Sequence, residues 1–437
     1  MSSIVLEKYS RAIKDVDTFR YRGRVSKVIG LTIESIGPPV NIGEICEITP
    51  ARGGKAIKAE VVGFRDNVVL LMPLGDMEGI GPGSGVTANG GTLKVPVGEE
   101  MLGRVLDGLG VPIDGQGPLR FSALYPVSNS PPNPLARKRI TEVLDLGIKS
   151  IDGLLTCGKG QRIGIFSGSG VGKSTLLGMI ARNTSADINV IGLIGERGRE
   201  VREFIENDLG EEGLKRSVVV AATSDQPALV RLKSAQLVTA IAEFFRSQGK
   251  DVILMMDSLT RVALAQREIG LAIGEPPVSR GYTPSVFAML PKLIERTGTA
   301  AEGSITGLYA VLVDGDDLNE PIADTARGIL DGHIVLSRNL ANKNHYPAVD
   351  ILQSISRVMP NIVDKEHLEY ARRIKNVAAV YKNAEDLISI GAYNSGSNPE
   401  IDYAIDKIED INMFLKQDIY EKVSFEGTLE QMKMLMD

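Results

Sequence analysis

The chain has 437 residues, 43% of them hydrophobic and 24% charged, a composition that excludes an intrinsically disordered protein. A chain of this length is too long for one compact core, so we expect two or three domains around a large α/β unit. The formal net charge of -6 argues against a generic nucleic-acid binder. The two cysteines, Cys46 and Cys157, have neither metal-site nor disulfide spacing, which favours a reducing cytoplasm. The chain has no apolar stretch of about 18 residues and no signal-peptide pattern, so any membrane role is expected to be peripheral.

The N-terminal region predicts a short helical segment followed by a small β-domain. In residues 1–18, the apolar Leu6, Tyr9, Ile13 and Val16 recur at helical spacing. This stripe either docks a partner or packs on its own domain. Residues 19–93 contain short β-rich runs broken by glycine, such as GEICEI and NVVLLMPL, and closely spaced short strands are typical of a small β-barrel or sandwich.

The middle of the chain alternates apolar strands with longer helical segments. We expect a helix over 228–249, and strands at 162–167, 189–195, 217–223, 251–257, 304–313 and 332–338. This alternation predicts an α/β domain with a mostly parallel sheet over residues 94–364. Residues 128–134, SNSPPNP, can form neither helix nor central strand and predict a linker between domains. The basic Arg137, Lys138 and Arg139 that follow are expected to form a solvated face.

After about Asp364 the strand pattern stops. Residues 367–391 and 399–417 have the pattern of helices, so residues 365–437 predict an α-helical C-terminal domain. The three histidines are scattered along the chain and are expected to be structural: His333, His345 and His367.

The strongest chemical signal is a glycine-rich run between the strand that ends at Ser167 and a helix that begins near Lys173. Glycines let successive backbone N–H groups turn toward phosphates, and the helix N-terminus favours negative charge. In this pattern Lys173 reaches the β- and γ-phosphates and Ser174 binds Mg²⁺. Ser167 departs from the strict pattern, which has glycine at that position. The predicted nucleotide-binding residues are Gly168, Ser169, Gly170, Val171, Gly172, Lys173, Ser174 and Thr175.

Two carboxylates follow apolar strands. Asp257 ends the strand 251–257. If this strand lies beside the one that precedes the glycine-rich loop, the carboxylate can hold Mg²⁺ through water. Its alternative role is to cap the helix that starts at Ser258. Glu196 comes directly after the strand 189–195, where its carboxylate can orient a water molecule for attack on a bound phosphate. Three other glutamates follow nearby, and position alone does not separate them strongly from Glu196. We expect Glu200, Glu203 and Glu206 to form a solvated helix face with Arg197, Arg199 and Arg202.

Longer motifs resemble a known family. GSGVGKST, GERGREVREF, VLVDGDDLNEPIADTARGILDGHIVLSR and HYPAVDILQSISRVM together are similar to the type III secretion ATPases, most of all those of flagellar export. These proteins are relatives of the rotary ATP synthase subunits, and the resemblance extends over nearly the whole chain. It implies a RecA-like P-loop core between an N-terminal β-barrel and a C-terminal helical domain. It also implies a homohexameric ring that hydrolyses Mg-ATP to drive protein export.

The resemblance also implies roles for single residues. It makes Lys173 and Ser174 ligands of phosphate and Mg²⁺, Glu196 the catalytic carboxylate, Asp257 the second metal-site acid, and Arg197 a neighbour of the γ-phosphate.

Two further residues have competing interpretations. Arg357 matches an arginine finger supplied to a neighbouring subunit, but it could instead cap a helix or pair with Asp350. Tyr346 matches an aromatic that packs on adenine, but it could instead be a packed turn residue.

The partners implied by the family are a stator-like regulatory protein at the N-terminus, export gate and central stalk proteins, and chaperone–substrate complexes. The expected location is cytoplasmic, peripheral at the inner face of the cytoplasmic membrane. Three other functions compete: a virulence-type secretion ATPase, a rotary ATP synthase subunit and a hexameric RNA translocase. The last is disfavoured because an RNA-binding domain should present basic positions interleaved with exposed aromatics, whereas residues 19–93 are glycine-rich, nearly charge-balanced and contain few aromatics.

Overall fold

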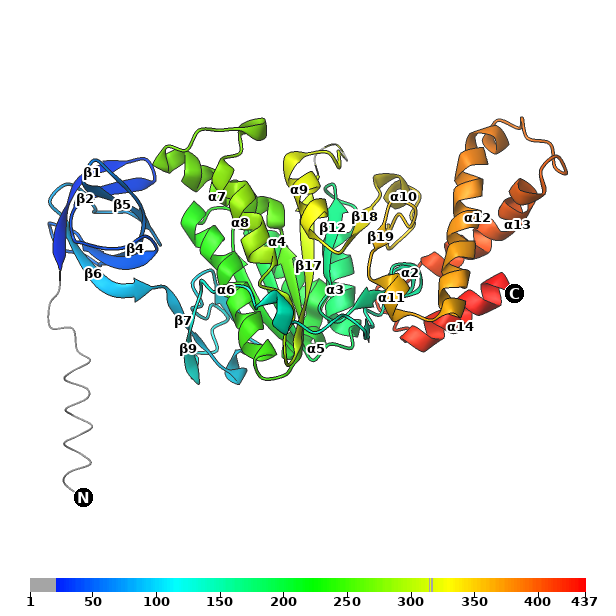
Figure 1. Cartoon of the computed structure of the whole chain (residues 1–437), viewed down its shortest axis with the longest axis horizontal. Coiled ribbons are helices and arrows are strands. Elements are labelled where there is room, and N and C mark those ends of the chain that lie inside the picture. Colours follow the sequence, from blue (N-terminus) through cyan, green and yellow to red (C-terminus); the bar gives the residue numbers. More distant parts are fainter. Residues whose placement is uncertain (1–20, 314, 316) are drawn as a thin grey trace, which may run out of the picture. The chain divides into compact units, whose positions relative to one another are not determined.

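The computed structural model describes residues 21–313, 315 and 317–437. Its contacts divide the chain into two compact units, and each is described by itself. Of the described residues, the smaller unit contains those from Tyr21 to Leu93 with the short segments Pro227–Val230 and Glu268–Pro276, and the larger unit contains the others. Figure 1 labels the elements of both. No helix among the described residues combines the length and hydrophobicity that a membrane span requires.

Six strands of the smaller unit close into an antiparallel barrel, in the order β1, β2, β5, β4, β3 and β6 (Figure 1). Their bounds are β1 (Arg22–Ile29), β2 (Thr32–Ile36), β3 (Glu44–Thr49), β4 (Ile57–Arg65), β5 (Val68–Pro73) and β6 (Gly85–Thr92). Buried side chains such as Ile33, Val61 and Leu71 fill the interior. The predicted barrel is confirmed. The closing strand β6 is missing from the prediction because Val86 is its only buried residue, so the period-two pattern does not appear in the sequence.

The larger unit is built on a nine-stranded sheet with the order β19, β18, β12, β17, β15, β13, β14 and β8, and β16 pairs with β17. The strands are β8 (Val105–Asp107), β12 (Arg162–Ser167), β13 (Ile188–Ile194), β14 (Ser217–Ala222), β15 (Asp251–Asp257), β16 (Gly298–Thr299), β17 (Ser304–Leu312), β18 (Gly332–Leu336) and β19 (Ile355–Ser356). From β18 to β8 every neighbouring pair is parallel. Every residue of β13 and β14 is buried, as in strands covered on both faces. The mostly parallel α/β core is confirmed.

Helices connect these strands. They are α3 (Lys173–Asn183), α4 (Gly198–Glu203), α5 (Gly210–Lys215), α6 (Ala228–Arg246), α7 (Leu259–Ile273), α8 (Pro284–Ile294), α9 (Pro321–Ile329), α10 (Arg338–Asn342) and α11 (Met359–Ile362). A π-helical turn, η3 (Phe204–Leu209), separates α4 from α5. Helix α3 approaches η3 so closely that a Cβ on Gly178 would lie 2.5 Å from the Asp208 carbonyl oxygen. A glycine is therefore required at that contact.

The segment that leads into β12 contains short strand pairs, β7 (Lys94–Val97) with β9 (Ala123–Pro126) and β10 (Val143–Leu144) with β11 (Cys157–Gly158), and the helix α2 (Lys149–Leu154). Residues 128–133 form no regular element, as predicted. They lie within the larger unit, however, so their interpretation as a linker between domains is corrected. Polar contacts hold this stretch to the core: the Asn129 Nδ2 donates to Glu243 Oε2 at 2.8 Å. Arg137 is likewise used internally, because it donates to the Thr297 carbonyl at 2.6 Å.

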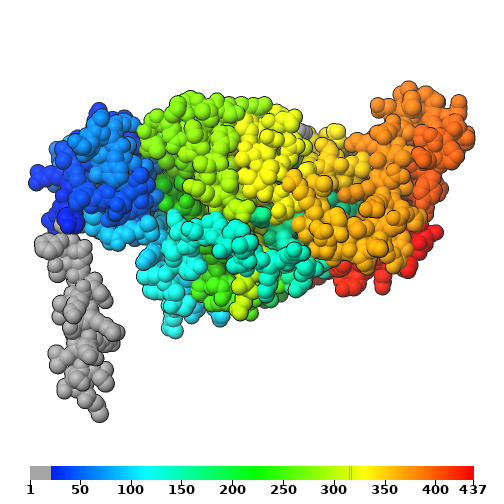
Figure 2. All heavy atoms as spheres, viewed as in Figure 1, coloured from blue at the N-terminus to red at the C-terminus, as the bar shows by residue number. Residues whose placement is uncertain are grey.

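Three helices follow the sheet: α12 (Lys365–Ser389), α13 (Pro399–Leu415) and α14 (Phe425–Met436). The first two were predicted from periodicity, and each begins with a capping side chain, Asp364 and Asn398 respectively. Their apolar faces belong to the same hydrophobic core as the sheet, through residues such as Ile374, Ile411 and Met432. Figure 2 shows these helices in orange and red. The C-terminal helical region is confirmed.

A buried ion pair fixes α6 to the segment after α8. Arg296 donates to both carboxylate oxygens of Glu243, at 2.8 and 2.9 Å, and the two side chains are only 4% and 3% exposed. Glu243→Ala would leave the guanidinium buried without its carboxylate, so we expect the free energy of unfolding to fall by about 3–5 kcal/mol. Urea unfolding followed by circular dichroism measures the change. Glu212→Ala is the matched control because the Glu212–Lys215 pair is exposed; an equal shift in both variants would contradict the prediction.

Candidate functional site

The glycine-rich run lies where the sequence predicted it, between the end of β12 at Ser167 and the start of α3 at Lys173. Gly170 and Gly172 have φ values of 75° and 86°, which side chains rarely adopt, so these two positions need glycine. Ser167 is the last residue of β12, fully buried and paired with both neighbouring strands. An extended strand position does not require glycine, which explains why the departure at Ser167 leaves the loop intact.

Lys173 is the centre of a cluster of charged side chains. Its Nζ contacts Asp257 Oδ1 and lies 3.9 Å from Glu196 Oε1. The three side chains come from the start of α3, the end of β15 and the turn after β13, and they are between 4% and 13% exposed. One expectation is corrected: β15 does not adjoin β12, because β17 lies between them. The Lys173 side chain reaches Asp257 even though β17 separates β12 from β15.

Glu196 reaches this cluster because the turn after β13 packs tightly. Gly195 has a φ of 74°, and a Cβ there would lie 2.9 Å from the Cβ of Arg261 on α7. The Glu196 Oε1 atom is buried and has no hydrogen-bond partner among the described residues. Burial and the neighbouring Asp257 carboxylate raise the pKa of Glu196 to about 7, against the opposing effect of Lys173. A carboxylate in this state is poised to exchange a proton near neutral pH.

A small cavity adjoins the three carboxylates of this region. Its volume is about 20 Å³, enough for one water-sized group. Its polar lining is Ser174, Glu196, Glu200 and Asp257, and Leu193, Val201 and Phe204 complete the wall. Hydroxyl and carboxylate oxygens are ligands that Mg²⁺ prefers, so the donor atoms of these residues suit a magnesium ion, whereas the cavity itself has room for a single water. Glu200 was predicted only as part of a solvated face, and its place here was not foreseen.

The remaining charged residues of this stretch behave as a helix surface. Arg197, Arg199 and Arg202 are each about three-quarters exposed and pair with Glu200, Glu203 and Glu206 respectively. The predicted pairing is therefore observed. Arg197 follows Glu196 directly, and its guanidinium lies 3.6 Å from the Glu200 carboxylate.

Tyr346 lies beside the phosphate-binding loop. A Cβ on Gly172 would be 3.4 Å from two of the Tyr346 ring carbons. The Tyr346 side chain remains substantially exposed, at 42%, so it is not a packed core aromatic. Its carbonyl accepts a hydrogen bond from the Gln417 N–H at 3.0 Å. The exposed part of the ring, beside Gly172, is consistent with the predicted contact to a base.

Thr175 is the last residue of the predicted nucleotide-binding run. Its hydroxyl is hydrogen-bonded to Asp208 in η3. Its backbone N–H, in the first turn of α3, is the group left to face a phosphate.

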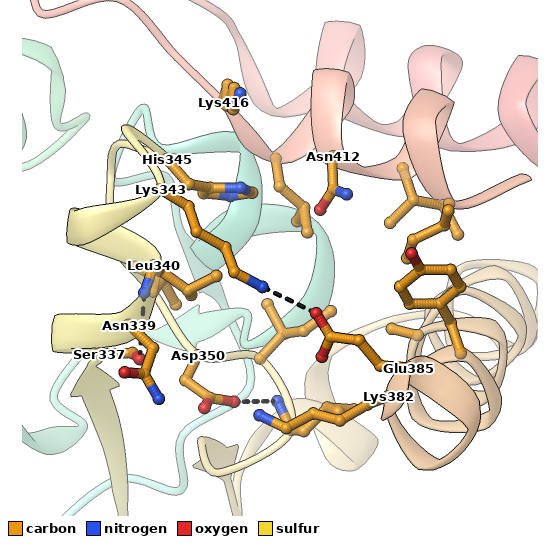
Figure 3. Close-up of a pocket in the computed structure, with 18 of the residues that line it drawn as sticks. Ser337, Asn339, Leu340, Lys343, His345, Asp350, Lys382, Glu385, Asn412 and Lys416 are labelled. Atoms are coloured by element: carbon orange, nitrogen blue, oxygen red, sulfur yellow. Dashed lines mark hydrogen bonds and ion pairs between the residues drawn. The ribbon is translucent and has the colours of Figure 1, made fainter. Parts of the chain in front are cut away.

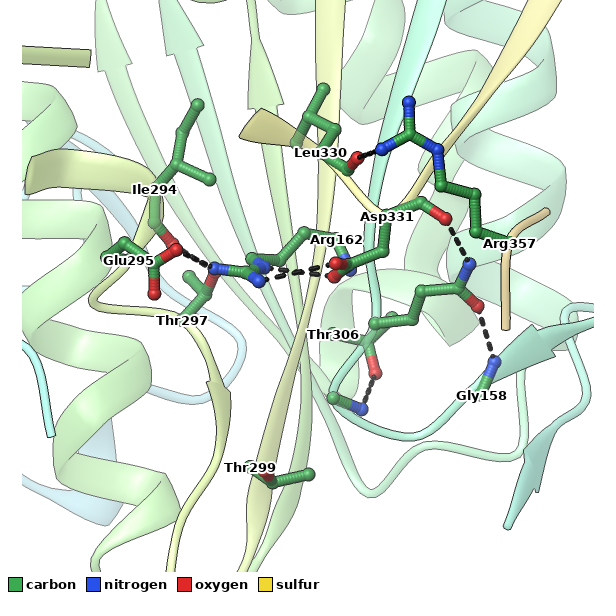
Figure 4. Close-up of polar contacts among 12 residues, drawn as sticks. Gly158, Arg162, Ile294, Glu295, Thr297, Thr299, Thr306, Leu330, Asp331 and Arg357 are labelled. Atoms are coloured by element: carbon green, nitrogen blue, oxygen red, sulfur yellow. Dashed lines mark hydrogen bonds and ion pairs between the residues drawn. The ribbon is translucent and has the colours of Figure 1, made fainter. Parts of the chain in front are cut away.

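Arg357 lies away from the Lys173 cluster of its own chain. It follows β19, which pairs with the first residues of β18, at the amino-terminal edge of the sheet. The phosphate loop is at the opposite edge, and six residues of β12 at about 3.3 Å each separate the two by roughly 20 Å. The Arg357 guanidinium donates to the Leu330 carbonyl at 3.3 Å (Figure 4). It also donates to the Arg327 carbonyl at 3.3 Å.

The Arg357 backbone is held by a polar network that the sequence pattern did not reveal. Its N–H donates to the Asp331 carbonyl at 3.0 Å, and the Asp331 carboxylate pairs with Arg162 at 3.0 Å (Figure 4). The buried Gln161 donates to both Asp331 and Ser356. Within its own chain Arg357 thus occupies the helix-capping alternative, at the end of α9. Asp350 is not its partner, since that carboxylate accepts from Leu352 and Gln353.

These features define a class of protein. A parallel sheet with a glycine loop after one strand, a lysine at a helix N-terminus and acids after two neighbouring strands is the site of a P-loop ATPase with a RecA-like core.

Comparisons with known proteins agree. The ATP synthase alpha/beta family nucleotide-binding domain matches residues 147–356, its beta-barrel domain matches residues 25–90, and the T3SS EscN ATPase C-terminal domain matches residues 363–434. The flagellum-specific ATP synthase of Bacillus subtilis is 59% identical over 97% of each chain. The type 3 secretion system ATPase of Xanthomonas euvesicatoria is 50% identical over 96% of this chain and 95% of its own.

A solved structure is equally similar. The assembled ATPase EscN from the type III secretion system of enteropathogenic E. coli superposes with a TM-score of 0.90 at 48% identity, over 94% of this chain and 99% of that one. The chain belongs to the family of flagellum-specific ATP synthases and type III secretion ATPases.

Proposed function

We propose that this chain hydrolyses ATP to ADP and phosphate and uses the energy for protein export through a flagellar type III secretion apparatus, as a homohexameric ring. The observation that carries the proposal is the convergence of Lys173, Glu196 and Asp257 at the carboxyl edge of the sheet, in a chain matched over its whole length by flagellum-specific ATP synthases. The assembled state of the relative EscN supports the ring.

The proposed chemistry follows from the site geometry. Lys173 and the N–H groups of the loop 168–175 bind the phosphates, and Tyr346 contacts the adenine. Ser174 and Asp257 would hold Mg²⁺, which when bound would neutralise the negative charge of the phosphates. Glu196 orients the attacking water from the side opposite the leaving group and accepts its proton.

Arg197 and Arg357 complete the proposed site from outside the cluster. Arg197, next to Glu196 and exposed, can swing toward the γ-phosphate. Arg357, at the far edge of its own sheet, can serve only the site of a neighbouring chain, so the ring supplies each site from two subunits. This position supports a finger in trans.

The pH dependence of hydrolysis tests the assignment of Glu196. With a pKa of about 7, this carboxyl is mostly protonated below pH 7 and cannot accept a proton, so kcat/KM should fall about tenfold for each pH unit well below that value and level off above it. Steady-state assays between roughly pH 5.5 and 9 measure the profile, because this range brackets the Glu196 pKa of about 7. The residual activity of Glu196→Gln should lack this acid limb, and persistence of the limb in that variant would contradict the assignment.

Among the alternatives, a virulence-type secretion ATPase is supported by the structural similarity to EscN. We favour flagellar export because flagellum-specific relatives reach 59% identity, compared with 50% for the type 3 secretion ATPase given above. The C-terminal match to a T3SS ATPase domain disfavours a rotary ATP synthase subunit. Nothing in the charge or the described surface favours an RNA translocase, and we propose no nucleic-acid partner.

Complementation tests the proposed pathway. The gene should restore swimming and export of flagellar filament protein to a Bacillus subtilis strain that lacks its own flagellum-specific ATP synthase, and Lys173→Ala should not. Restoration of secretion in a virulence-system deletion but not in the flagellar one would favour the alternative. Failure of both, with purified chain active on ATP, would overturn the export proposal but not the hydrolysis.

The proposed partners are a stator-like regulatory protein at the N-terminus, the export gate, a central stalk protein and chaperone–substrate complexes, with the ring peripheral at the inner face of the cytoplasmic membrane. The relative EscN has been solved with its central stalk EscO. The apolar stripe Leu6, Tyr9, Ile13 and Val16 lies outside the described residues. Deleting residues 1–17 should abolish binding of the stator-like protein in a pull-down without changing ring formation; unchanged binding would assign the stripe to the chain's own domain.

A further inference from the structure

A second concave site lies between the sheet and the C-terminal helices. It is bounded by α10 and the loop after it on one side and by α12 and α13 on the other (Figure 3). Its volume of about 520 Å³ is within the range of sites that bind small organic molecules. None of the phosphate-loop residues lines it. Its apolar wall includes Leu340, Val349, Ile351, Ala378, Ile411 and Leu415.

The polar residues of this groove leave uncompensated positive charge. The Asp350 carboxylate accepts from two backbone N–H groups at 3.0 Å and from the Gln353 amide at 2.7 Å. Glu385 pairs with Lys343 at 2.8 Å across the groove (Figure 3). Lys382 and Lys416 also line the groove, and neither has a carboxylate partner among the described residues. Two lysines, one on α12 and one at the end of α13, therefore line a cavity whose acids are already paired.

His345 adds a buried polar atom without a partner. The residue is 5% exposed and lines the groove, and its Nε2 has no hydrogen-bond partner among the described residues. Burial and the nearby Lys416 lower the pKa of His345, so the imidazole is neutral at pH 7. Buried polar atoms are nearly always paired, so this Nε2 is a hydrogen-bonding position open to a polar group in the groove.

We propose that this groove binds a small amphipathic anion. The apolar body of the ligand lies against α12 and α13, and its carboxylate, sulfonate or phosphate is held at the end formed by His345 and Lys416. Lys382 on α12 adds a longer-range attraction. The inference stands independently of the proposed hydrolysis, because no residue of the Lys173 cluster takes part.

Two residues of the groove are adjacent in sequence to residues beside the proposed nucleotide site. His345 directly precedes Tyr346, and Lys416 precedes Gln417, whose N–H donates to the Tyr346 carbonyl at 3.0 Å. These contacts connect the groove to the Tyr346 ring beside Gly172, so a ligand in the groove is expected to change the affinity for nucleotide. By linkage, nucleotide must change the affinity of the anion by the same factor as the anion changes that of the nucleotide.

The binding test uses 8-anilinonaphthalene-1-sulfonate, a fluorescent aromatic anion, with the full chain. We expect saturable binding at one site per chain, weakened about fivefold by Lys416→Gln and by Lys382→Gln, since a partly exposed ion pair is worth up to about 1 kcal/mol. The matched control is Lys365→Gln, because Lys365 is an exposed lysine at the start of α12, the helix that also carries Lys382. This substitution should not change the affinity for the sulfonate probe. The uncharged N-phenyl-1-naphthylamine should bind alike to all four proteins. Ala378→Phe should fill the groove and abolish binding of both probes, with circular dichroism to establish that it folds.

Mg-ADP separates the groove from the nucleotide site. We expect ADP to shift the dissociation constant of the sulfonate probe to a plateau, as two coupled sites require. A dissociation constant that rises without limit with ADP would show that the probe occupies the nucleotide site and would overturn the proposal. Equal weakening by Lys365→Gln, or binding that does not saturate, would overturn it as well.

Discussion

Glu196→Gln is expected to bind Mg-ATP with nearly unchanged affinity while hydrolysis falls by a factor on the order of 10²–10⁴. The substitution keeps the size of the side chain and its hydrogen-bonding reach, but it removes the charge that polarises the attacking water. Glu196 lines the cavity of about 20 Å³, which has room for one water, so the substitution removes the negative charge at the place where the attacking water would lie. The measurements are single-turnover hydrolysis and equilibrium binding of a fluorescent ATP analogue.

Two controls make this result specific. Lys173→Ala should weaken nucleotide binding itself, because its charge contacts the phosphates before the reaction begins. Glu203→Gln should leave hydrolysis unchanged, because this glutamate lies on the exposed face of α4, where it pairs with Arg199. Near wild-type turnover by Glu196→Gln would show that another carboxylate is the base, and Glu200 would be the first to test because it lines the same cavity.

Arg357→Ala is expected to bind ATP but to hydrolyse it on the order of 10³-fold more slowly or worse, because a finger stabilises charge that appears only as the γ-phosphoryl leaves. Arg357→Lys should fail largely as well, since an ammonium cannot reproduce the planar guanidinium. The structure sharpens this expectation: Arg357 lies at the amino-terminal edge of the sheet, away from its own phosphate loop. Near-normal hydrolysis by Arg357→Ala would end the finger assignment.

Mixed rings distinguish a shared site from a structural role of Arg357. When Arg357→Ala and Glu196→Gln chains mix at random, roughly one interface in four joins an intact pocket to an intact finger, if the sites act independently. Hydrolysis by the mixture above that of both parents would establish the shared site. A purely structural role, for instance in capping α9 through the Leu330 carbonyl, predicts no rescue in rings shown to contain both chains.

The sequence by itself determined the local parts of this protein. The six predicted core strands, the helix after the glycine loop and the helices α12 and α13 follow from apolar periodicity and capping residues, which act over a few neighbouring positions. The loop residues from Gly168 to Ser174 were identifiable for the same reason. Gly170 and Gly172 have positive φ, which glycine adopts without help from distant contacts, and Lys173 is the first residue of the helix that follows.

Only the tertiary structure decided what depends on strand order and on distant contacts. Parallel strands can be arranged in many orders, so the insertion of β17 between β12 and β15 was not visible along the chain. The same holds for the place of Glu200 at the cavity and of Arg357 at the opposite sheet edge, because both positions result from packing between elements. The raised pKa of Glu196 arises from burial and from Asp257, which is 61 residues away in sequence (257 minus 196) and next to it in space. The burial and the neighbouring charges that shift this pKa depend on tertiary packing, whereas the identity of the titrating residue is given by the sequence.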